Sequence, residues 1–207
     1  MITDPVGYSH SLSLKEGENF IYGVNRSVTD EITLVQEITA DNVYELVDKE
    51  DYKDMLLQNF AGLMYFMLSQ NVDTLDIVKY LVTRGANIHA NNEHALELAS
   101  HFGHLPIVKF LVDNGADIHA SNDIALRNAS RTAQLEVVEF LLSKGADIHA
   151  KNDDALRSAS RYGLLPVVEF LVSKGANIHA EKDDAIRGAI CFDHQQVVDF
   201  LVSKVAN

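Results

Sequence analysis

The sequence predicts an all-α protein: a solenoid of stacked helix pairs that carries a small N-terminal extension. A string of six residues, Gly-Ala-Asp/Asn-Ile-His-Ala, recurs with a strict period of 30 and begins at Gly85, Gly115, Gly145 and Gly175. Each period also contains two segments in which apolar residues recur at helical spacing. One helix pair of this size cannot bury its apolar faces alone, so neighbouring copies must stack.

The first helix of each copy is predicted from a narrow face of small residues. In the segment from Asp153 to Tyr162, the residues Leu156, Ala159 and Ser160 share one helix face. Small side chains allow a neighbouring helix to approach closely. An asparagine precedes three of these helices, and its side-chain oxygen can accept a backbone N–H, so we expect N-caps at Asn92, Asn122 and Asn152.

The second helix of each copy is more apolar, and its ends are marked by proline and glycine. In the segment from Leu165 to Lys174, Val167, Val168 and Leu171 provide an apolar face. A proline in the first turn loses no hydrogen bond, which suits Pro106 and Pro166. A glycine directly after the helix favours a left-handed C-cap, which we expect at Gly115, Gly145 and Gly175.

These strings, together with Ala-Leu-Arg-x-Ala and Val-Val-Glu-Phe-Leu, resemble the ankyrin repeat over roughly residues 75–207, with a degenerate unit before them. The period is three residues shorter than the family's period of about 33, and the loss falls between Ala150 and Asp154. Arginine also replaces the family's histidine, at Arg127, Arg157 and Arg187. This 30-residue variant is similar to the ankyrin arrays of amoeba-infecting giant DNA viruses, a likeness that implies a viral origin.

We expect two parts in the chain. Residues 1–58 form an acidic extension with 12 Asp and Glu against 4 Lys and Arg. Its first part, 1–38, is expected to be mixed in structure. Residues 41–58 are expected to be a helical cap that covers the apolar segment Ala61–Leu68, because a helix that is apolar on every side must be buried on every side. The array then occupies 59–207, with units at about 59–88, 89–118, 119–148, 149–178 and 179–207.

Composition excludes several function classes. A net charge of -13 and a pI near 5.0 argue against general binding of nucleic acid or anionic membranes, which requires clustered Lys and Arg. The single cysteine, Cys191, excludes an internal disulfide framework and a multi-cysteine zinc site. It suits a reducing compartment, so we expect an intracellular, cytoplasmic protein, in the host cytoplasm if viral. Neither a signal peptide nor a membrane-spanning segment is expected.

No catalytic or metal site is expected. Stacked repeats lie ~8–10 Å apart, whereas zinc needs ligand nitrogens within ~2.1 Å of one centre. One histidine per repeat therefore cannot converge on a metal, and we expect hydrogen bonds across the loop and between repeats from His89, His119, His149 and His179. His101 and His104 lack a third ligand, and Cys191 near His194 lacks an enclosed site. The chain is therefore expected to be no enzyme and to use no cofactor.

Two arginine columns have different expected roles. Arg127, Arg157 and Arg187 each follow an aspartate by four residues, so we interpret them as structural ion pairs within the helix. Arg131 and Arg161 have a basic residue at that spacing instead. We interpret these two as candidates for contact with a partner.

The resemblance implies where a partner would bind. In the family, the last two residues of the first helix line the concave face. Carried over by register, these positions predict a partner-binding site at His101, Phe102, Arg131, Thr132, Arg161, Tyr162 and Phe192, with Cys191 in the same row. Aromatic and arginine side chains are common interface anchors. A solvated face with a few aromatics packed on their neighbours is the structural alternative.

The predicted function is therefore recognition of a protein partner through this concave face. Basic residues in an acidic molecule favour a partner that presents an acidic or amphipathic segment. One alternative is a substrate adaptor that docks through residues 1–58 onto a ubiquitin ligase or other host machinery, and another is a structural component of a viral particle. The partner's identity and the oligomeric state stay open at this point.

Overall fold

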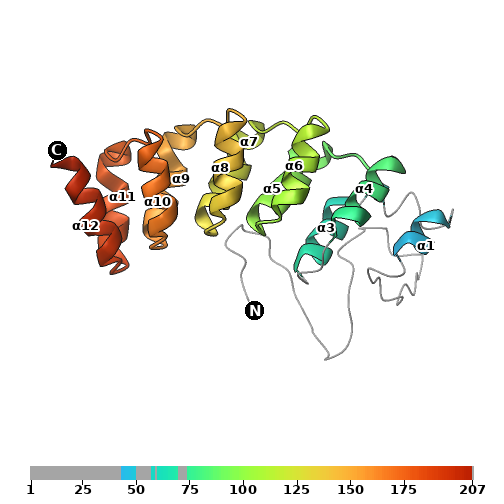
Figure 1. Ribbon diagram of the computed structural model, residues 1–207, viewed down its shortest axis with the longest axis horizontal. Coiled ribbons are helices and arrows are strands. Elements are labelled where there is room, and N and C mark those ends of the chain that lie inside the picture. The colour runs from blue at the N-terminus through green and yellow to red at the C-terminus, as the bar shows by residue number, and fades with distance from the viewer. Residues whose placement is uncertain (1–42, 50–56, 59, 70–73, 207) are drawn as a thin grey trace, which may run out of the picture.

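The computed structural model describes residues 43–49, 57–58, 60–69 and 74–206, which form helices and connections without any strand. The helix pairs lie side by side in chain order (Figure 1). The fold is an all-α solenoid, as the period predicted. The helices are α1 (Val43–Asp48), α3 (Phe60–Ser69), α4 (Leu75–Thr83), α5 (Ala90–His101), α6 (Leu105–Asp113), α7 (Ala120–Arg131), α8 (Leu135–Ser143), α9 (Ala150–Arg161), α10 (Leu165–Ser173), α11 (Ala180–Cys191) and α12 (Gln195–Val205).

The second helices supply the centre of the core. They carry a fully buried leucine column, made of Leu111, Leu141, Leu171 and Leu201. The predicted proline positions fall in the first turn of α6 and α10. The predicted glycine C-caps are also confirmed, because these residues have φ values of 94°, 99° and 96°, which glycine adopts without a Cβ clash, at Gly115, Gly145 and Gly175.

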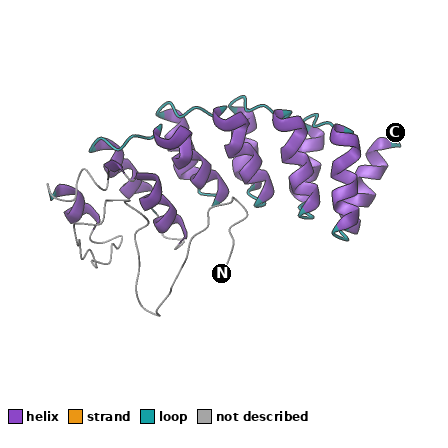
Figure 2. Cartoon of the chain, turned by 180° about the vertical axis from the view of Figure 1, so that it is seen from behind, coloured by secondary structure: helices purple, strands orange, loops and turns teal. Residues whose placement is uncertain are grey.

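The first helices carry the small residues that let repeats approach closely. Ala129 and Ala159 are fully buried, as are Ser130 and Ser160. Neighbouring first helices (α5, α7, α9, α11) pack against one another more extensively than neighbouring second helices do. The array therefore curves toward its first helices, which form the concave side. Connections between repeats follow one edge of the array, and the turns within repeats follow the other (Figure 2).

A left-handed turn precedes each regular first helix, at the place where the repeat is shorter than the family pattern. Ser121, Asn122 and Asp123 have φ values of 52°, 58° and 54°, and the equivalent three residues of the other repeats have similar values. An L-residue in this conformation costs roughly 1–2 kcal/mol. Contacts elsewhere must therefore hold the turn in place.

The predicted asparagine N-caps are wrong. Asn92 and Asn152 lie inside the left-handed turn, where their side chains face the next repeat instead of the helix that follows. The amide of Asn92 donates to the hydroxyl of Ser121, and the amide of Asn152 donates to the carboxylate of Glu181. These asparagines join repeats to one another.

A buried carboxylate in the same turn links each repeat to the next. Oδ1 of Asp153 lies 3.0 Å from Nδ1 of His149, and it accepts a hydrogen bond of 2.7 Å from the backbone N–H of Asn177 in the following repeat. One side chain thus holds its own turn and the next loop.

This link is present inside the array and incomplete at its ends. Asp123 repeats both contacts, at 3.1 Å to His119 and 2.8 Å to the next loop. In the first copy the residue is Glu93, whose longer side chain reaches His89 while its second oxygen is buried without a partner. In α11 the carboxylate of Asp183 contacts only His179 among the described residues.

At the N-terminal end, α3 is buried on nearly every side, as its composition predicted. Phe60, Leu63 and Met64 are at most 1% exposed, whereas Tyr65 is exposed and departs from that prediction. Helix α1 packs against α4: the rings of Tyr44 and Tyr80 lie 4.9 Å apart, and Asp48 pairs with Arg84 at 2.7 Å. The remaining residues of the expected cap, Tyr52, Met55 and Leu56, and the segment 1–38 lie outside the described residues.

Replacing Leu171 by Ala is expected to lower the free energy of unfolding by about 2–5 kcal/mol, because the side chain is fully buried and leaves a cavity. Denaturation in urea, followed by circular dichroism, measures the loss. Glu169→Ala, on the exposed face of the same helix, is the control. A loss no larger than that of the control would contradict the assigned core position.

Replacing Asp153 by Ala is expected to lower the free energy of unfolding by about 1.5–3 kcal/mol, since it removes two hydrogen bonds to a buried charge. The matched control is Asp183→Ala, at the equivalent position where the contact to a following loop is absent. Its loss should be clearly smaller in the same urea titration. Equal losses for the two variants would show that the link between repeats contributes nothing measurable.

Candidate partner-binding face

The residues predicted to bind a partner form one row. Each repeat contributes the last residue of its first helix and the residue after it, at the turn that leads to the second helix. The row therefore follows the edge of the array along which the turns within repeats lie (Figure 2). It contains His101 and Phe102 after α5, Arg131 and Thr132 after α7, Arg161 and Tyr162 after α9, and Cys191 and Phe192 after α11.

The beginning of the row is an aromatic cluster. The ring of Phe102 lies 5.0 Å from the ring of His101 and 5.8 Å from that of Tyr65, both in edge-to-face orientation. Such pairs are worth ~0.5–1.5 kcal/mol beyond the area that they bury. Tyr65 was missed by the sequence analysis, because it belongs to the degenerate unit, where no repeating column marks it as surface.

The middle of the row is tied into the scaffold. The hydroxyl of Thr132 lies 2.9 Å from the carbonyl oxygens of both His101 and Asn128, and so bridges two repeats. The guanidinium of Arg131 donates to the side chain of Asn128 at 3.0 Å. Asn128 in turn donates to Glu97 of the preceding repeat. The hydroxyl of Thr132 is thus engaged within the scaffold, as the structural interpretation of this row expects.

The C-terminal half of the row is open to solvent. Tyr162 is 51% exposed and Phe192 is 56% exposed, although both are large aromatic residues. The side chain of Arg161 is 44% exposed. These residues lie outside the buried columns of the repeat, so the core does not require them. They are the members of the predicted row that are best placed to meet a partner.

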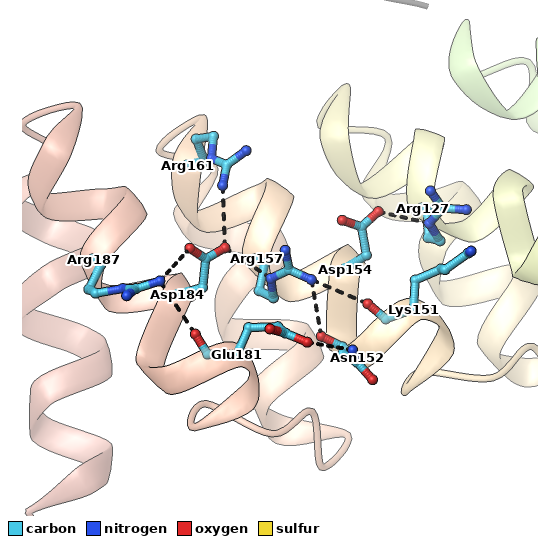
Figure 3. A network of polar contacts seen from close by, with 9 residues as sticks. All are labelled: Arg127, Lys151, Asn152, Asp154, Arg157, Arg161, Glu181, Asp184 and Arg187. Carbon is cyan, nitrogen blue, oxygen red and sulfur yellow. Dashed lines mark hydrogen bonds and ion pairs between the residues drawn. The ribbon is translucent and has the colours of Figure 1, made fainter.

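The arginines next to this row pair across repeats. Nε of Arg127 donates to Asp154 at 2.7 Å, and Nε of Arg157 donates to Asp184 at 2.9 Å, in each case in the following repeat (Figure 3). The prediction that they pair with the aspartate four residues earlier is wrong. That aspartate lies in the left-handed turn, outside the regular helix, and its carboxylate is directed to the histidine and to the next loop, as in Asp153.

The carboxylate of Asp184 accepts hydrogen bonds from three arginines. Oδ2 of Asp184 accepts from Arg157 and, at 3.3 Å, from Arg161, while Oδ1 accepts from Arg187 at 3.0 Å (Figure 3). The hydrogen bond from Arg157 is the main reason that the pKa of Asp184 lies below its ordinary value, and Arg187 and the charge of Arg161 add to the effect. Three positive charges around one negative charge leave a locally basic patch in an acidic protein.

Sequence reasoning missed this cluster because Asp154 and Asp184 have no counterpart in the earlier repeats, where Ile124 and His94 occupy the same register. A comparison of the last two repeats alone could have found the signal. In these two repeats Asp154 and Asp184 occupy the same register, and each lies 27 residues after an arginine of the preceding repeat, Arg127 or Arg157.

The histidine column makes the expected contact across its own loop. Each of the four histidines places Nδ1 at 2.6–3.1 Å from the carboxylate four residues later. The contact between repeats comes from that carboxylate and not from the ring. Within the described residues, no three His, Cys, Asp or Glu side chains are grouped so that they could hold a metal ion. Cys191 is exposed at the end of α11.

Among the described residues, no helix has the length and apolar character needed to cross a membrane.

Comparison with known proteins gives one family match. A family model described as ankyrin repeats (3 copies) matches the chain at residues 35–122, 66–152 and 126–207. The search of curated proteins finds no match.

Replacing Asp184 by Asn is expected to lower the free energy of unfolding by about 1–3 kcal/mol at neutral pH, because three guanidinium groups lose their shared counter-charge. A carboxyl whose pKa is lowered by folding stabilises the protein above its unfolded pKa, and this contribution is lost as the pH falls through the folded pKa. The difference between wild type and variant should therefore shrink as the pH falls below 3.8, the ordinary pKa of an aspartate side chain.

Urea titrations at a series of pH values measure this difference. The control is Asp193→Asn, which removes an exposed carboxylate that has no ion pair among the described residues. A difference between wild type and Asp184→Asn that does not depend on pH would contradict an electrostatic role for the cluster.

Proposed function

Because the chain belongs to the ankyrin repeat family, we propose that it recognises a partner protein through the concave side of its repeat stack. Ankyrin repeats are generally protein–protein interaction modules, and the family is a non-catalytic interaction fold. The proposal is specific about the contact surface: the C-terminal half of the row, with Arg161, Tyr162 and Phe192 at its centre, and His101, Phe102, Arg131 and Thr132 extending it.

One observation carries this proposal. Two aromatic rings, Tyr162 and Phe192, are more than half exposed on a protein whose repeating apolar columns are buried. Exposed aromatic residues next to arginines are the side chains that most often supply binding energy at interfaces. The row varies from repeat to repeat while the leucine and alanine columns stay constant, as expected of a surface that is free to adapt to a partner.

The chemistry of the partner follows from the charge of the patch. Arg157, Arg161 and Arg187 share one carboxylate, so the patch carries an excess of positive charge. The chain as a whole is acidic, with a net charge of -13. An acidic or amphipathic segment would be attracted to the patch and repelled elsewhere, which favours one orientation of binding.

A substrate adaptor role is the second candidate, and it rests on the charge of residues 1–58. This segment contributes -8 of the net charge of -13. In the adaptor proposal, residues 1–58 bind a second protein complex, such as a ubiquitin ligase, while the array, 59–207, selects the substrate.

The Arg131→Glu/Arg161→Glu and Tyr162→Ala/Phe192→Ala double variants are expected to weaken partner binding by about tenfold or more, since interface anchors are worth ~2 kcal/mol or more. The melting temperature of Tyr162→Ala/Phe192→Ala should change little, because neither side chain belongs to a buried column, whereas Arg131→Glu/Arg161→Glu also removes the hydrogen bonds to Asn128 and Asp184 and should lower it. Affinity purification with the full chain, followed by mass spectrometry, measures recovery of each bound protein.

The matched control is Lys79→Glu/Lys109→Glu, which makes the same change of charge on the exposed faces of α4 and α6. The proposal is supported if the wild type and the control both recover a protein that neither Arg131→Glu/Arg161→Glu nor Tyr162→Ala/Phe192→Ala recovers. If the variants and the control recover the same proteins, the concave face is not the binding surface.

A further inference from the structure

The row of the candidate partner-binding face has a chemical order along the array. At its start, Phe102 packs edge-to-face on Tyr65, which is 43% exposed. At its other end, the ring of Phe192 is more than half exposed. Between these aromatic groups lie Arg131 and Arg161, the last residues of α7 and α9. Over four consecutive repeats the row is therefore apolar, basic, basic and apolar.

Both arginines in the middle of the row can bind a further carboxylate. Arg131 donates to the neutral amide of Asn128, and it forms no ion pair with a carboxylate of the described residues. Arg161 reaches Asp184 at 3.3 Å, which is the longest of the three arginine contacts to that carboxylate. A guanidinium has five N–H donors, so one such contact leaves donors for a partner.

The spacing of the row favours one backbone conformation of a bound segment. Stacked repeats lie ~8–10 Å apart. In a polyproline II segment every third side chain faces the same way, and these side chains are ~9.3 Å apart. In a strand the matching side chains are ~6.6–6.8 Å apart, which is too short. In an α-helix every seventh side chain returns to one face after ~10.5 Å, so the mismatch grows with each repeat. Only the polyproline II spacing fits all four row positions.

The chemistry of the row favours the same conformation. Acidic side chains on one face of a helix repel one another, whereas charged segments extend readily. An extended segment of this kind also has little conformational freedom to lose on binding, and it docks on aromatic surfaces. The exposed rings of Tyr162 and Phe192 provide such a surface next to Arg161.

We propose that the row binds a polyproline II segment of the partner protein, with apolar side chains at its first and tenth positions and carboxylates at its fourth and seventh. The apolar side chains pack on Phe102 and Phe192, and the carboxylates accept hydrogen bonds from Arg131 and Arg161. The other positions are neutral, because the net charge of -13 repels further acids. This inference rests on the proposed function and adds the conformation and spacing of the bound segment.

Fluorescence anisotropy of labelled synthetic peptides, titrated with the full chain, tests the proposal. The period-three peptide has leucine at positions one and ten, glutamate at positions four and seven, and proline, serine or glutamine elsewhere. Its control has the same composition, but the glutamates stand at positions three and eight, where their side chains face away from the arginines. The period-three peptide should bind about tenfold tighter than this control. A longer peptide with the same four side chains at every seventh position tests a helical partner.

A variant of the chain tests the assigned contacts. Arg131→Gln should weaken binding of the period-three peptide by about tenfold. The loss should disappear for a peptide in which the facing glutamate is glutamine, and substitutions at positions four and seven, tested in turn, give the direction of the segment. A loss of stability would weaken all peptides alike, so this comparison is independent of it. Lys109→Gln, on the exposed face of α6, is the control and should leave the affinity unchanged.

Three results overturn the inference: equal affinities for the period-three peptide and its control, tighter binding of the period-seven peptide, or no binding of any peptide at millimolar concentration. The proposed function survives each of them if affinity purification still recovers a protein that Arg131→Glu/Arg161→Glu and Tyr162→Ala/Phe192→Ala both lose. If that protein is absent as well, the proposed function fails together with the inference.

Discussion

The carboxylate of the left-handed turn is the contact on which the stack depends. Three consecutive L-residues in the left-handed region are unfavourable by themselves, and the carboxylate of Asp123 or Asp153 offsets this by binding its own histidine and the backbone of the next loop. The same contact sets the spacing between repeats, because it joins two loops at one point.

Close spacing on one side of the array determines which surface is available for binding. The first helices approach each other through alanine and serine, while the second helices are kept apart by leucine, valine and phenylalanine. The array therefore curves, and the ends of its first helices are gathered on the inner side. Arg157 and Arg161 of one repeat and Arg187 of the next come close enough to share Asp184 for the same reason.

The two ends of the array differ in how the stacking surface is completed. At α3 the apolar residues are covered, so the core is closed. At α11 and α12 the same columns face outward, and the carboxylate that links inner repeats has no following loop within the described residues. Interior and end repeats thus have nearly the same sequence but different surfaces, because burial depends on the next repeat and not on the residue itself.

The sequence by itself determined the all-α fold, the helix pairs, the glycine C-caps and the buried leucine column, since each of these follows from local periodicity and backbone preference. It also placed the candidate row at the ends of the first helices, through the register of the repeat. Only the tertiary structure decided the partners of the polar side chains. Asn152, Arg127 and Asp153 were expected to act within their own helix, but each reaches the following repeat. Spacing along a helix predicts contacts three or four residues apart, whereas these contacts join residues 24–29 positions apart that become neighbours only when repeats stack.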